Sequence, residues 1–130
     1  MPYRVVLSTI NDRQRAEELA ATLLEERLVA CVNVVGPILS LYRWQGSIER
    51  DEEYLLIMKT MASHETALAS RVQELHPYEV PELLMLPVEA GAPAYLQWLA
   101  ASLSEAVSRD TSETAHLNAG DPCEHGASSS

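Results

Sequence analysis

Several residue types that carry particular structural or functional roles are scarce in this chain of 130 residues. It contains no phenylalanine, so leucine, valine, isoleucine and alanine must fill most of the core. It has two cysteines, Cys31 in an apolar run and Cys123 in a polar segment, and nothing in their settings suggests that they pair. The sequence therefore does not predict a disulfide scaffold.

Basic residues are also few, with 9 lysines and arginines against 19 acidic residues and a formal net charge of −10. They are scattered along the chain, whereas a nucleic-acid-binding protein usually gathers them on one face to contact phosphates. We therefore expect no nucleic-acid partner. The negative field attracts cations, including metal ions, although an excess of acidic residues also simply keeps a protein soluble.

Long apolar segments are absent. No run is long enough to span a membrane, and the first ten residues lack the apolar stretch and small-residue cleavage site of a signal peptide. We therefore expect no membrane association and a location in the reducing cytoplasm. The length is that of one domain with a single core.

The first elements that the sequence does show are a strand and a helix. Residues 3–10 are rich in β-branched side chains and predict a strand. Asn11 and Asp12 are suitable helix N-caps. Residues 13–27 carry apolar side chains three or four positions apart, which predicts an amphipathic helix with its acidic residues off the apolar stripe.

A long β-hairpin is predicted next. Residues 28–35 are apolar and β-rich, and Gly36-Pro37 interrupts them as a bulge or a turn. Residues 38–44 alternate in polarity, and Gln45-Gly46-Ser47 is typical of a hairpin tip. Residues 48–60 begin polar and end apolar, so the hairpin has a charged outer end and a buried inner end.

The remaining elements are a helix, a short strand and a last helix. Ser63 is placed to cap a helix that ends at His76-Pro77, because the residue before a proline is pushed out of helical geometry. Residues 82–88 predict a short apolar strand, and residues 94–107 predict a third helix after a Gly-Ala-Pro turn.

The composition changes near the end of the chain. Residues 109–130 hold small and polar residues with almost no large apolar side chain, so they cannot bury enough surface to offset the entropy of ordering. We therefore expect one folded domain over residues 1–108 and a disordered polar tail over residues 109–130.

The predicted order is β-α-β-β-α-β with an extra C-terminal helix. This is the split βαβ, or ferredoxin-like, arrangement of the α+β class, in which both main helices lie on one face of an antiparallel sheet. The third helix is too short to cover the other face, and the long hairpin extends beyond a single small domain. Both features predict burial against other copies of the same chain.

Catalytic motifs are missing. The sequence has no HExxH motif, no P-loop, no Rossmann glycine fingerprint and no persuasive Ser-His-Asp arrangement. Residues 8–12, at the end of the first strand, have neither the arginine nor the glycine cradle that the ferredoxin-like acylphosphatases carry after that strand. We therefore expect a binding protein with no organic cofactor, and not an enzyme.

Several local strings, in this order and spacing, resemble the CutA family of divalent-cation tolerance proteins. They are Ala30-Cys31-Val32-Asn33, Ser40-Leu41-Tyr42-Arg43-Trp44-Gln45-Gly46-Ser47-Ile48, Lys59-Thr60, His76-Pro77-Tyr78-Glu79-Val80-Pro81-Glu82 and Gly91-Ala92-Pro93-Ala94-Tyr95-Leu96-Gln97-Trp98. The resemblance covers roughly residues 3–105, and the HPYEVPE string is its most specific part.

The resemblance implies a ferredoxin-like fold and a compact homotrimer in which the hairpin strands extend the sheet across subunits. It also implies a role in the tolerance of, and response to, divalent cations, with binding of copper or another divalent ion as the activity. The trimer is similar in architecture to the PII signalling proteins. A regulatory or scaffold trimer that binds a small ligand or a partner protein between subunits is therefore the alternative.

His76 is the first candidate metal ligand, because imidazole is the commonest side-chain ligand of transition metals and carboxylates can complete such a site. Glu79 and Glu82 lie close to it in sequence. The alternative for His76 is a helix-ending histidine that bonds backbone groups and shapes the turn. For Glu79 and Glu82 the alternative is an ion pair with Lys59 or Arg71.

Cys31 is the second candidate metal ligand, since a thiolate suits copper(I) or zinc. Its apolar strand equally fits a buried core cysteine. Some members of the family carry a cysteine near the position of Ser8, and serine is a poorer ligand for a soft metal.

Four further residues are assigned to the trimer interface or to its cleft: Tyr42, Trp44, Lys59 and Tyr78. The aromatic side chains either stack on a ligand or anchor the interface, where aromatic residues are enriched. Lys59 is placed to hold an anion in a cleft between subunits.

Overall fold

The computed structural model describes residues 2–104. The predicted polar tail, residues 109–130, and residues 105–107 of the predicted third helix lie outside the described residues, and Ser104, within that prediction, is the C-cap residue and not helical. Within the described part, no helix has both the length and the apolar character needed to cross a membrane.

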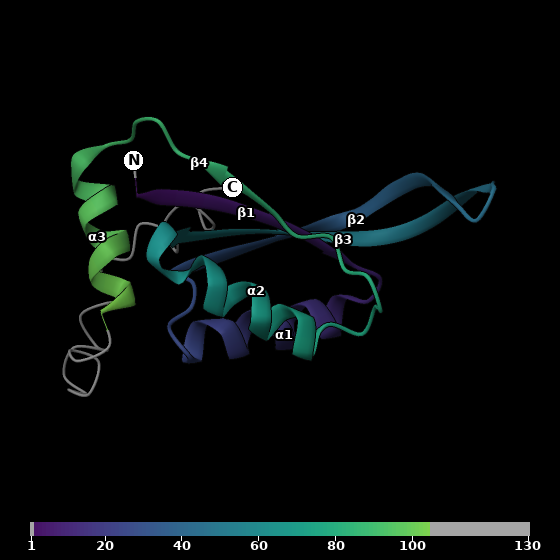
Figure 1. The fold of residues 1–130 in the computed structure, drawn as a ribbon, viewed down its shortest axis with the longest axis horizontal. Coiled ribbons are helices and arrows are strands. Elements are labelled where there is room, and N and C mark those ends of the chain that lie inside the picture. The colour runs from purple at the N-terminus through teal and green to yellow at the C-terminus, as the bar shows by residue number, and fades with distance from the viewer. Residues whose placement is uncertain (1, 105–130) are drawn as a thin grey trace.

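The fold is the predicted ferredoxin-like α+β arrangement with an extra helix (Figure 1). The elements are β1 (Tyr3–Ile10), α1 (Arg13–Glu25), β2 (Cys31–Trp44), β3 (Ser47–Met61), the 3-10 turn η1 (Ala62–His64), α2 (Glu65–Leu75), β4 (Leu84–Pro87) and α3 (Pro93–Leu103). The four strands form one antiparallel sheet in the order β2-β3-β1-β4.

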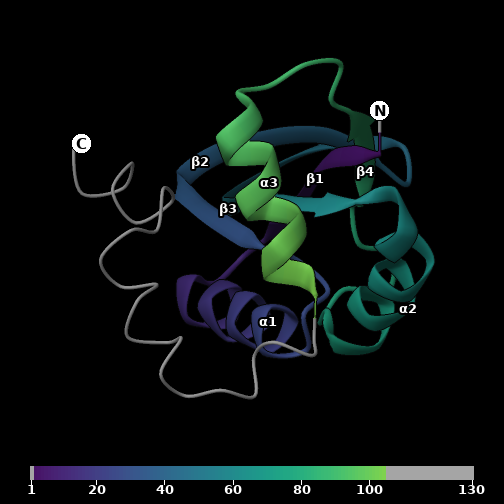
Figure 2. The same ribbon diagram turned by 90° about the vertical axis from the view of Figure 1, so that its left-hand side faces the viewer.

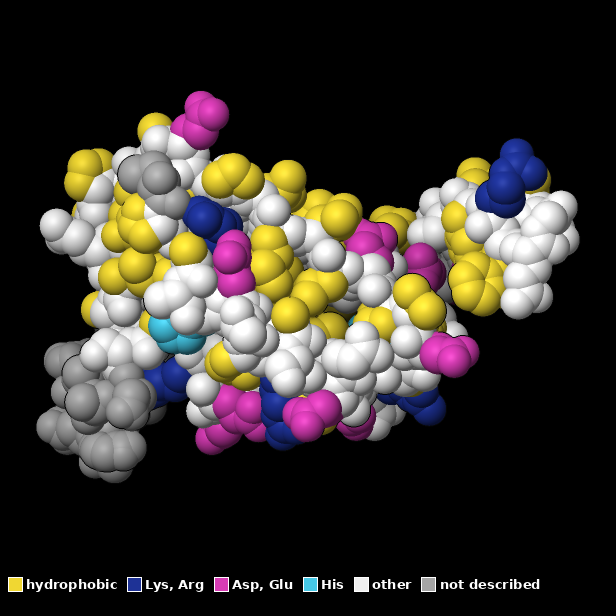
Figure 3. Space-filling view, viewed as in Figure 1, with side chains coloured by type: hydrophobic (Ala, Val, Ile, Leu, Met, Phe, Trp, Pro, Cys, Tyr) yellow, Lys and Arg dark blue, Asp and Glu magenta, His cyan; other side chains and the backbone are white. Residues whose placement is uncertain are grey.

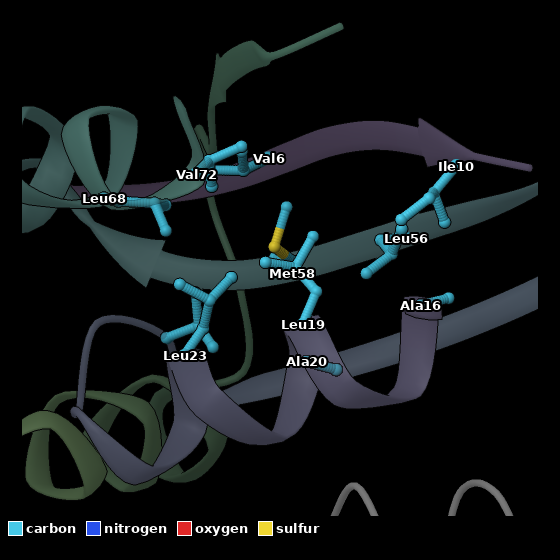
Figure 4. Close-up of a cluster of buried hydrophobic side chains, with 11 residues drawn as sticks. Val6, Ile10, Ala16, Leu19, Ala20, Leu23, Leu56, Met58, Leu68 and Val72 are labelled. Carbon is cyan, nitrogen blue, oxygen red and sulfur yellow. The ribbon is translucent and has the colours of Figure 1, made fainter. Parts of the chain in front are cut away.

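The hydrophobic core lies between the sheet and the helix pair α1 and α2 (Figure 4). The alternation of strands sends every second side chain of β1 and β3 to this face, and the apolar stripes of the helices meet them. The buried cluster consists of Val6, Ile10, Ala16, Leu19, Ala20, Leu23, Val29, Leu56, Met58, Leu68 and Val72. Without phenylalanine, aliphatic side chains and one methionine fill the core.

The hairpin of β2 and β3 is a single long ribbon that reaches beyond the helices (Figure 1). The two predicted strands on either side of Gly36-Pro37 are one strand with a bulge, where the register shifts between Val35 and Ile38. Gly36 is required there, because a Cβ atom at this position would lie 2.6 Å from Cδ2 of Tyr54.

Two helix boundaries differ from the expectation. The predicted side-chain cap by Ser63 is wrong, because η1 precedes α2, His64 is the N-cap residue, and no side-chain capping bond forms. The Ser63 hydroxyl contacts Nδ1 of His64 at 3.0 Å instead. The first helix ends at Glu25, and Arg27 then adopts a positive φ of 59° that turns the chain toward β2.

Among the elements of residues 2–104, none forms a layer of helices over the sheet face opposite α1 and α2, here called the open face. The strand register places Cys31, Lys59, Val5 and Leu86 in one row across this face. The next row holds Asn33, Ile57, Leu7 and Leu84. The helix α3 stands only at the end of the sheet where β1 begins (Figure 2).

Large apolar side chains consequently remain in contact with solvent on the open face and along the hairpin. Figure 3 shows such side chains above the sheet and again at the hairpin end. The exposed set includes Val35, Leu39, Leu41, Tyr42, Trp44, Ile48, Leu84 and Leu86. So many exposed large apolar side chains are unusual for a monomer and are typical of an interface.

Candidate functional site

His76 ends α2 and is nearly sealed from solvent, with 6% of its surface exposed. Its Nε2–H donates to the backbone carbonyl of Thr9 at 2.8 Å. Its Nδ1 accepts a hydrogen bond from the backbone N–H of Tyr78 at 3.1 Å. These partners fix the neutral tautomer that carries its proton on Nε2. Burial lowers the pKa of His76, which also favours the neutral ring at pH 7.

The His76 ring therefore ties the loop after α2 to the end of β1. A metal ion at either ring nitrogen would have to replace one of these two hydrogen bonds. This geometry matches the alternative interpretation of His76, in which the residue ends the helix and bonds backbone groups.

The same loop is fastened to the hairpin by Tyr78. The Tyr78 hydroxyl donates to Oε2 of Glu53 at 2.6 Å, and its ring meets the His76 ring edge-on at a centroid distance of 4.6 Å. Glu53 is only 7% exposed. Burial and the bond to Glu53 raise the pKa of Tyr78, so its hydroxyl remains a donor at neutral pH.

Glu53 was not singled out from the sequence. It is one of several acidic residues at the polar start of β3, and only the register, which pairs it with Ile38, distinguishes it from its exposed neighbours. The one feature of the sequence that could have identified Glu53 is its position, where β3 changes from polar to apolar.

A second tyrosine–carboxylate pair lies farther out on the hairpin. The Tyr42 hydroxyl donates to Oδ2 of Asp51, and this bond raises the pKa of Tyr42 to about 12. The register places Tyr42, Asp51 and Glu53 on one side of the ribbon. Trp44, at the tip, is 51% exposed and stacks on no other aromatic ring among the described residues.

Lys59 lies half-buried on the open face. Its Nζ donates to Oδ1 of Asn33 and lies 3.8 Å from Sγ of Cys31. Burial lowers the pKa of Lys59, because the charged form loses hydration. The register explains this grouping, since Cys31 is directly opposite Lys59 on β2 and Asn33 is two residues along the same face.

Cys31 is 4% exposed and is disulfide-bonded. The expectation that it does not pair is therefore wrong. The other cysteine of the sequence, Cys123, lies outside the described residues. In this state the sulfur of Cys31 is not a thiolate.

The four predicted metal ligands do not converge within one subunit. His76 contacts the Thr9 end of β1, whereas Cys31 lies in the row of Val5, roughly 13 Å away along the strand at ~3.3 Å per residue. Glu79 and Glu82 have exposed side chains. Among residues 2–104, no three histidine, cysteine or acidic residues are grouped as a metal site.

Glu79 and Glu82 also do not form the alternative ion pairs. Arg71 binds Glu26, the C-cap residue of α1, at 2.7 Å, which fastens α2 to the end of α1, and it also binds Glu74 within α2 at 3.2 Å. Glu82 contributes instead through its backbone carbonyl, which accepts the buried hydroxyl of Ser8 at 2.7 Å. Their acidic side chains remain directed to solvent or to another molecule.

Comparison with known proteins gives one consistent result. The pattern of the family described as CutA1 divalent ion tolerance protein matches residues 4–102. A divalent-cation tolerance protein CutA of Thermus thermophilus is 47% identical over 95 residues, covering 73% of this chain and 92% of that protein.

Solved structures agree with this result. The CutA crystal structure from Xylella fastidiosa superposes with a TM-score of 0.78 at 38% identity, covering 80% of this chain and 100% of that one. A periplasmic divalent cation tolerance protein CutA from Archaeoglobus fulgidus gives a TM-score of 0.76 at 31% identity, covering 78% and 99%.

The Tyr78–Glu53 bond gives a stability prediction. The variant Tyr78→Phe keeps the ring contact with His76 but leaves the buried Glu53 carboxylate without its donor, which should cost about 1–3 kcal/mol of unfolding free energy. Urea denaturation at a fixed protein concentration measures it. The matched control is Tyr42→Phe, whose bond to Asp51 is exposed and whose loss should be clearly smaller. Equal losses in the two variants would contradict the assignment of Tyr78–Glu53 as the buried link.

Proposed function

The chain belongs to the CutA1 divalent ion tolerance family, and on this premise we propose that it acts in divalent-ion tolerance as a homotrimer. The open face and the hairpin supply the contacts between subunits. The binding activity lies in the clefts between subunits, and the protein is not an enzyme.

The observation that carries the assembly is the uncovered apolar surface. Leu41 is 55% exposed on a ribbon that extends away from the domain, and Leu84 and Leu86 are exposed on β4. Strands β2 and β4 are also the two edges of the sheet, so each has backbone groups available to pair with another chain. Packing copies of the chain against one another buries the apolar side chains and gives the backbone groups of the edge strands hydrogen-bond partners.

For the metal ion we propose copper as the first candidate, with His76, Glu79 and Glu82 as the predicted ligands and with Cys31 as a fourth when its disulfide is reduced. These residues are separated within one subunit. An ion bound by them therefore takes ligands from more than one subunit, or it reaches His76 only after that side chain gives up one of its hydrogen bonds. Imidazole and carboxylate donors suit divalent copper and zinc.

The alternative is a regulatory or scaffold trimer that binds a small ligand or a partner protein in the same clefts. The specific support for it is that both His76 nitrogens are already bonded and that Cys31 is buried. We also propose a cytoplasmic location for this chain, although the Archaeoglobus fulgidus relative is described as periplasmic.

The assembly is tested by its mass in solution. Light scattering after gel filtration should give three times the chain mass of 14.4 kDa. The variant Leu41→Glu places a charge on the hairpin surface and should shift the protein toward monomer. Leu24→Glu, at a side chain 41% exposed on the outer side of α1, is the matched control and should stay trimeric. A monomeric unmodified protein at micromolar concentration would contradict the proposal.

Metal binding is tested by calorimetric titration of the metal-free protein with copper and with zinc. We expect saturable binding at a fixed ratio per subunit, weakened at least about tenfold in His76→Ala, which is ~1.4 kcal/mol of binding free energy. His64→Ala is the control histidine, because His64 lies at the start of α2, away from the loop. Binding that is unchanged in His76→Ala would exclude His76, and no binding to the unmodified protein would favour the small-ligand alternative.

A further inference from the structure

Lys59 is the only lysine of the chain, and it lies in the middle of an apolar surface. Its cross-strand neighbours are Val5 on β1 and Cys31 on β2, and Val5 is followed in the same row by Leu86 on β4. Ile57, two residues before it, points to the same face.

Within residues 2–104, the contacts of the Lys59 ammonium group are with neutral groups. It donates to the amide oxygen of Asn33 and approaches the sulfur of Cys31. Among residues 2–104, no carboxylate oxygen lies within 4.0 Å of it, whereas Arg4 and Arg71 each form an ion pair with a glutamate of another element. Within the described part of the chain, the half-buried lysine is therefore placed without a carboxylate partner.

A partly dehydrated cation without a counter-ion is unfavourable, and the lowered pKa of Lys59 is one consequence of its burial. An anion brought to this position gains a strong charge-assisted hydrogen bond in surroundings of low dielectric constant. If subunits pack over the open face, solvent is excluded further and the need for a counter-ion increases.

We propose that Lys59 and Asn33 form a binding site for a small monoanionic carboxylate with an apolar body. The carboxylate accepts hydrogen bonds from the Lys59 ammonium and from the amide N–H group of Asn33. The apolar body rests on Val5, Ile57 and Leu86. This deepens the small-ligand alternative and rests on the proposed assembly, because the second wall of the site belongs to a neighbouring copy.

The charge and the surroundings select this class of ligand. One ammonium group balances a single negative charge, whereas a phosphate dianion would bring a second charge into an apolar surface and lose its hydration there. A carboxylate from another copy of the chain would use the same donors, and it would leave no room for a free ligand.

The single lysine makes the site directly observable. Reductive methylation with ¹³C-formaldehyde labels only the Lys59 amine and the N-terminal amine, and the methylated lysine keeps its positive charge. Titration with hexanoate should shift the Lys59 methyl resonance in a saturable manner and raise the pKa read from it. The N-terminal resonance should stay in place. Hexanol, which has the same apolar chain without the charge, should not shift the Lys59 signal.

Calorimetry on the unmethylated protein provides the variants. Lys59→Met keeps an unbranched apolar side chain and should weaken hexanoate binding at least tenfold. Arg50→Met removes an exposed cation of the hairpin and should leave binding within twofold. Inorganic phosphate should bind more weakly than hexanoate.

Three results would overturn the inference. They are the absence of a saturable shift with hexanoate, an equal response to hexanol or phosphate, and hexanoate binding that survives Lys59→Met. The mass of each sample is measured in parallel. A trimer that does not bind hexanoate overturns this inference alone, whereas a monomer overturns the proposed assembly.

Discussion

The one-sided coverage of the sheet is the constraint on which the rest of the structure depends. In a βαββαβ chain both crossover helices return on the same face, so α1 and α2 complete one core and leave the other face open. The helix α3 lies only at one end of the sheet (Figure 2). Among residues 2–104, the exposed apolar side chains, the position of β2 and β4 at the edges of the sheet, and the lack of a carboxylate partner for Lys59 all follow from this geometry.

The loop after α2 is bonded both to β1 and to the hairpin. His76 fastens it to β1, and Tyr78 fastens it to Glu53 on the hairpin. Together the two bonds connect the end of α2 with the end of β1 and with the base of the hairpin.

Local patterns were sufficient for the order of the elements and for the core. Alternation along β1 and the spacing of Ala16, Leu19 and Leu23 identified which side chains are buried, because burial follows directly from the periods of strand and helix. The cap by Ser63 was wrong because η1 adds a turn before α2, and sequence patterns place helix ends poorly. The bulge at Gly36 was one of two options, and contact with Tyr54 decides it.

The candidate site was harder to predict, since it depends on the register between strands. The sequence identified His76, Cys31, Lys59 and Tyr78 as notable residues, but not that Lys59 contacts Asn33 or that Tyr78 contacts Glu53. These contacts join residues 26 and 25 positions apart, and only the pairing of β2 with β3 and the path of the loop bring them together. For the same reason the sequence did not show that His76 and Cys31 lie at different levels of the sheet.

The most direct test of the uncovered face is hydrogen–deuterium exchange of the hairpin in the unmodified protein. In a single chain, residues 38–50 form a solvated ribbon and their amides, especially those on the outer edge of β2, should exchange far faster than the buried helix segment 16–23. If copies of the chain cover this surface, we predict that the ribbon exchanges about as slowly as that segment. Exchange of the ribbon at the rate of an exposed hairpin would contradict burial between subunits.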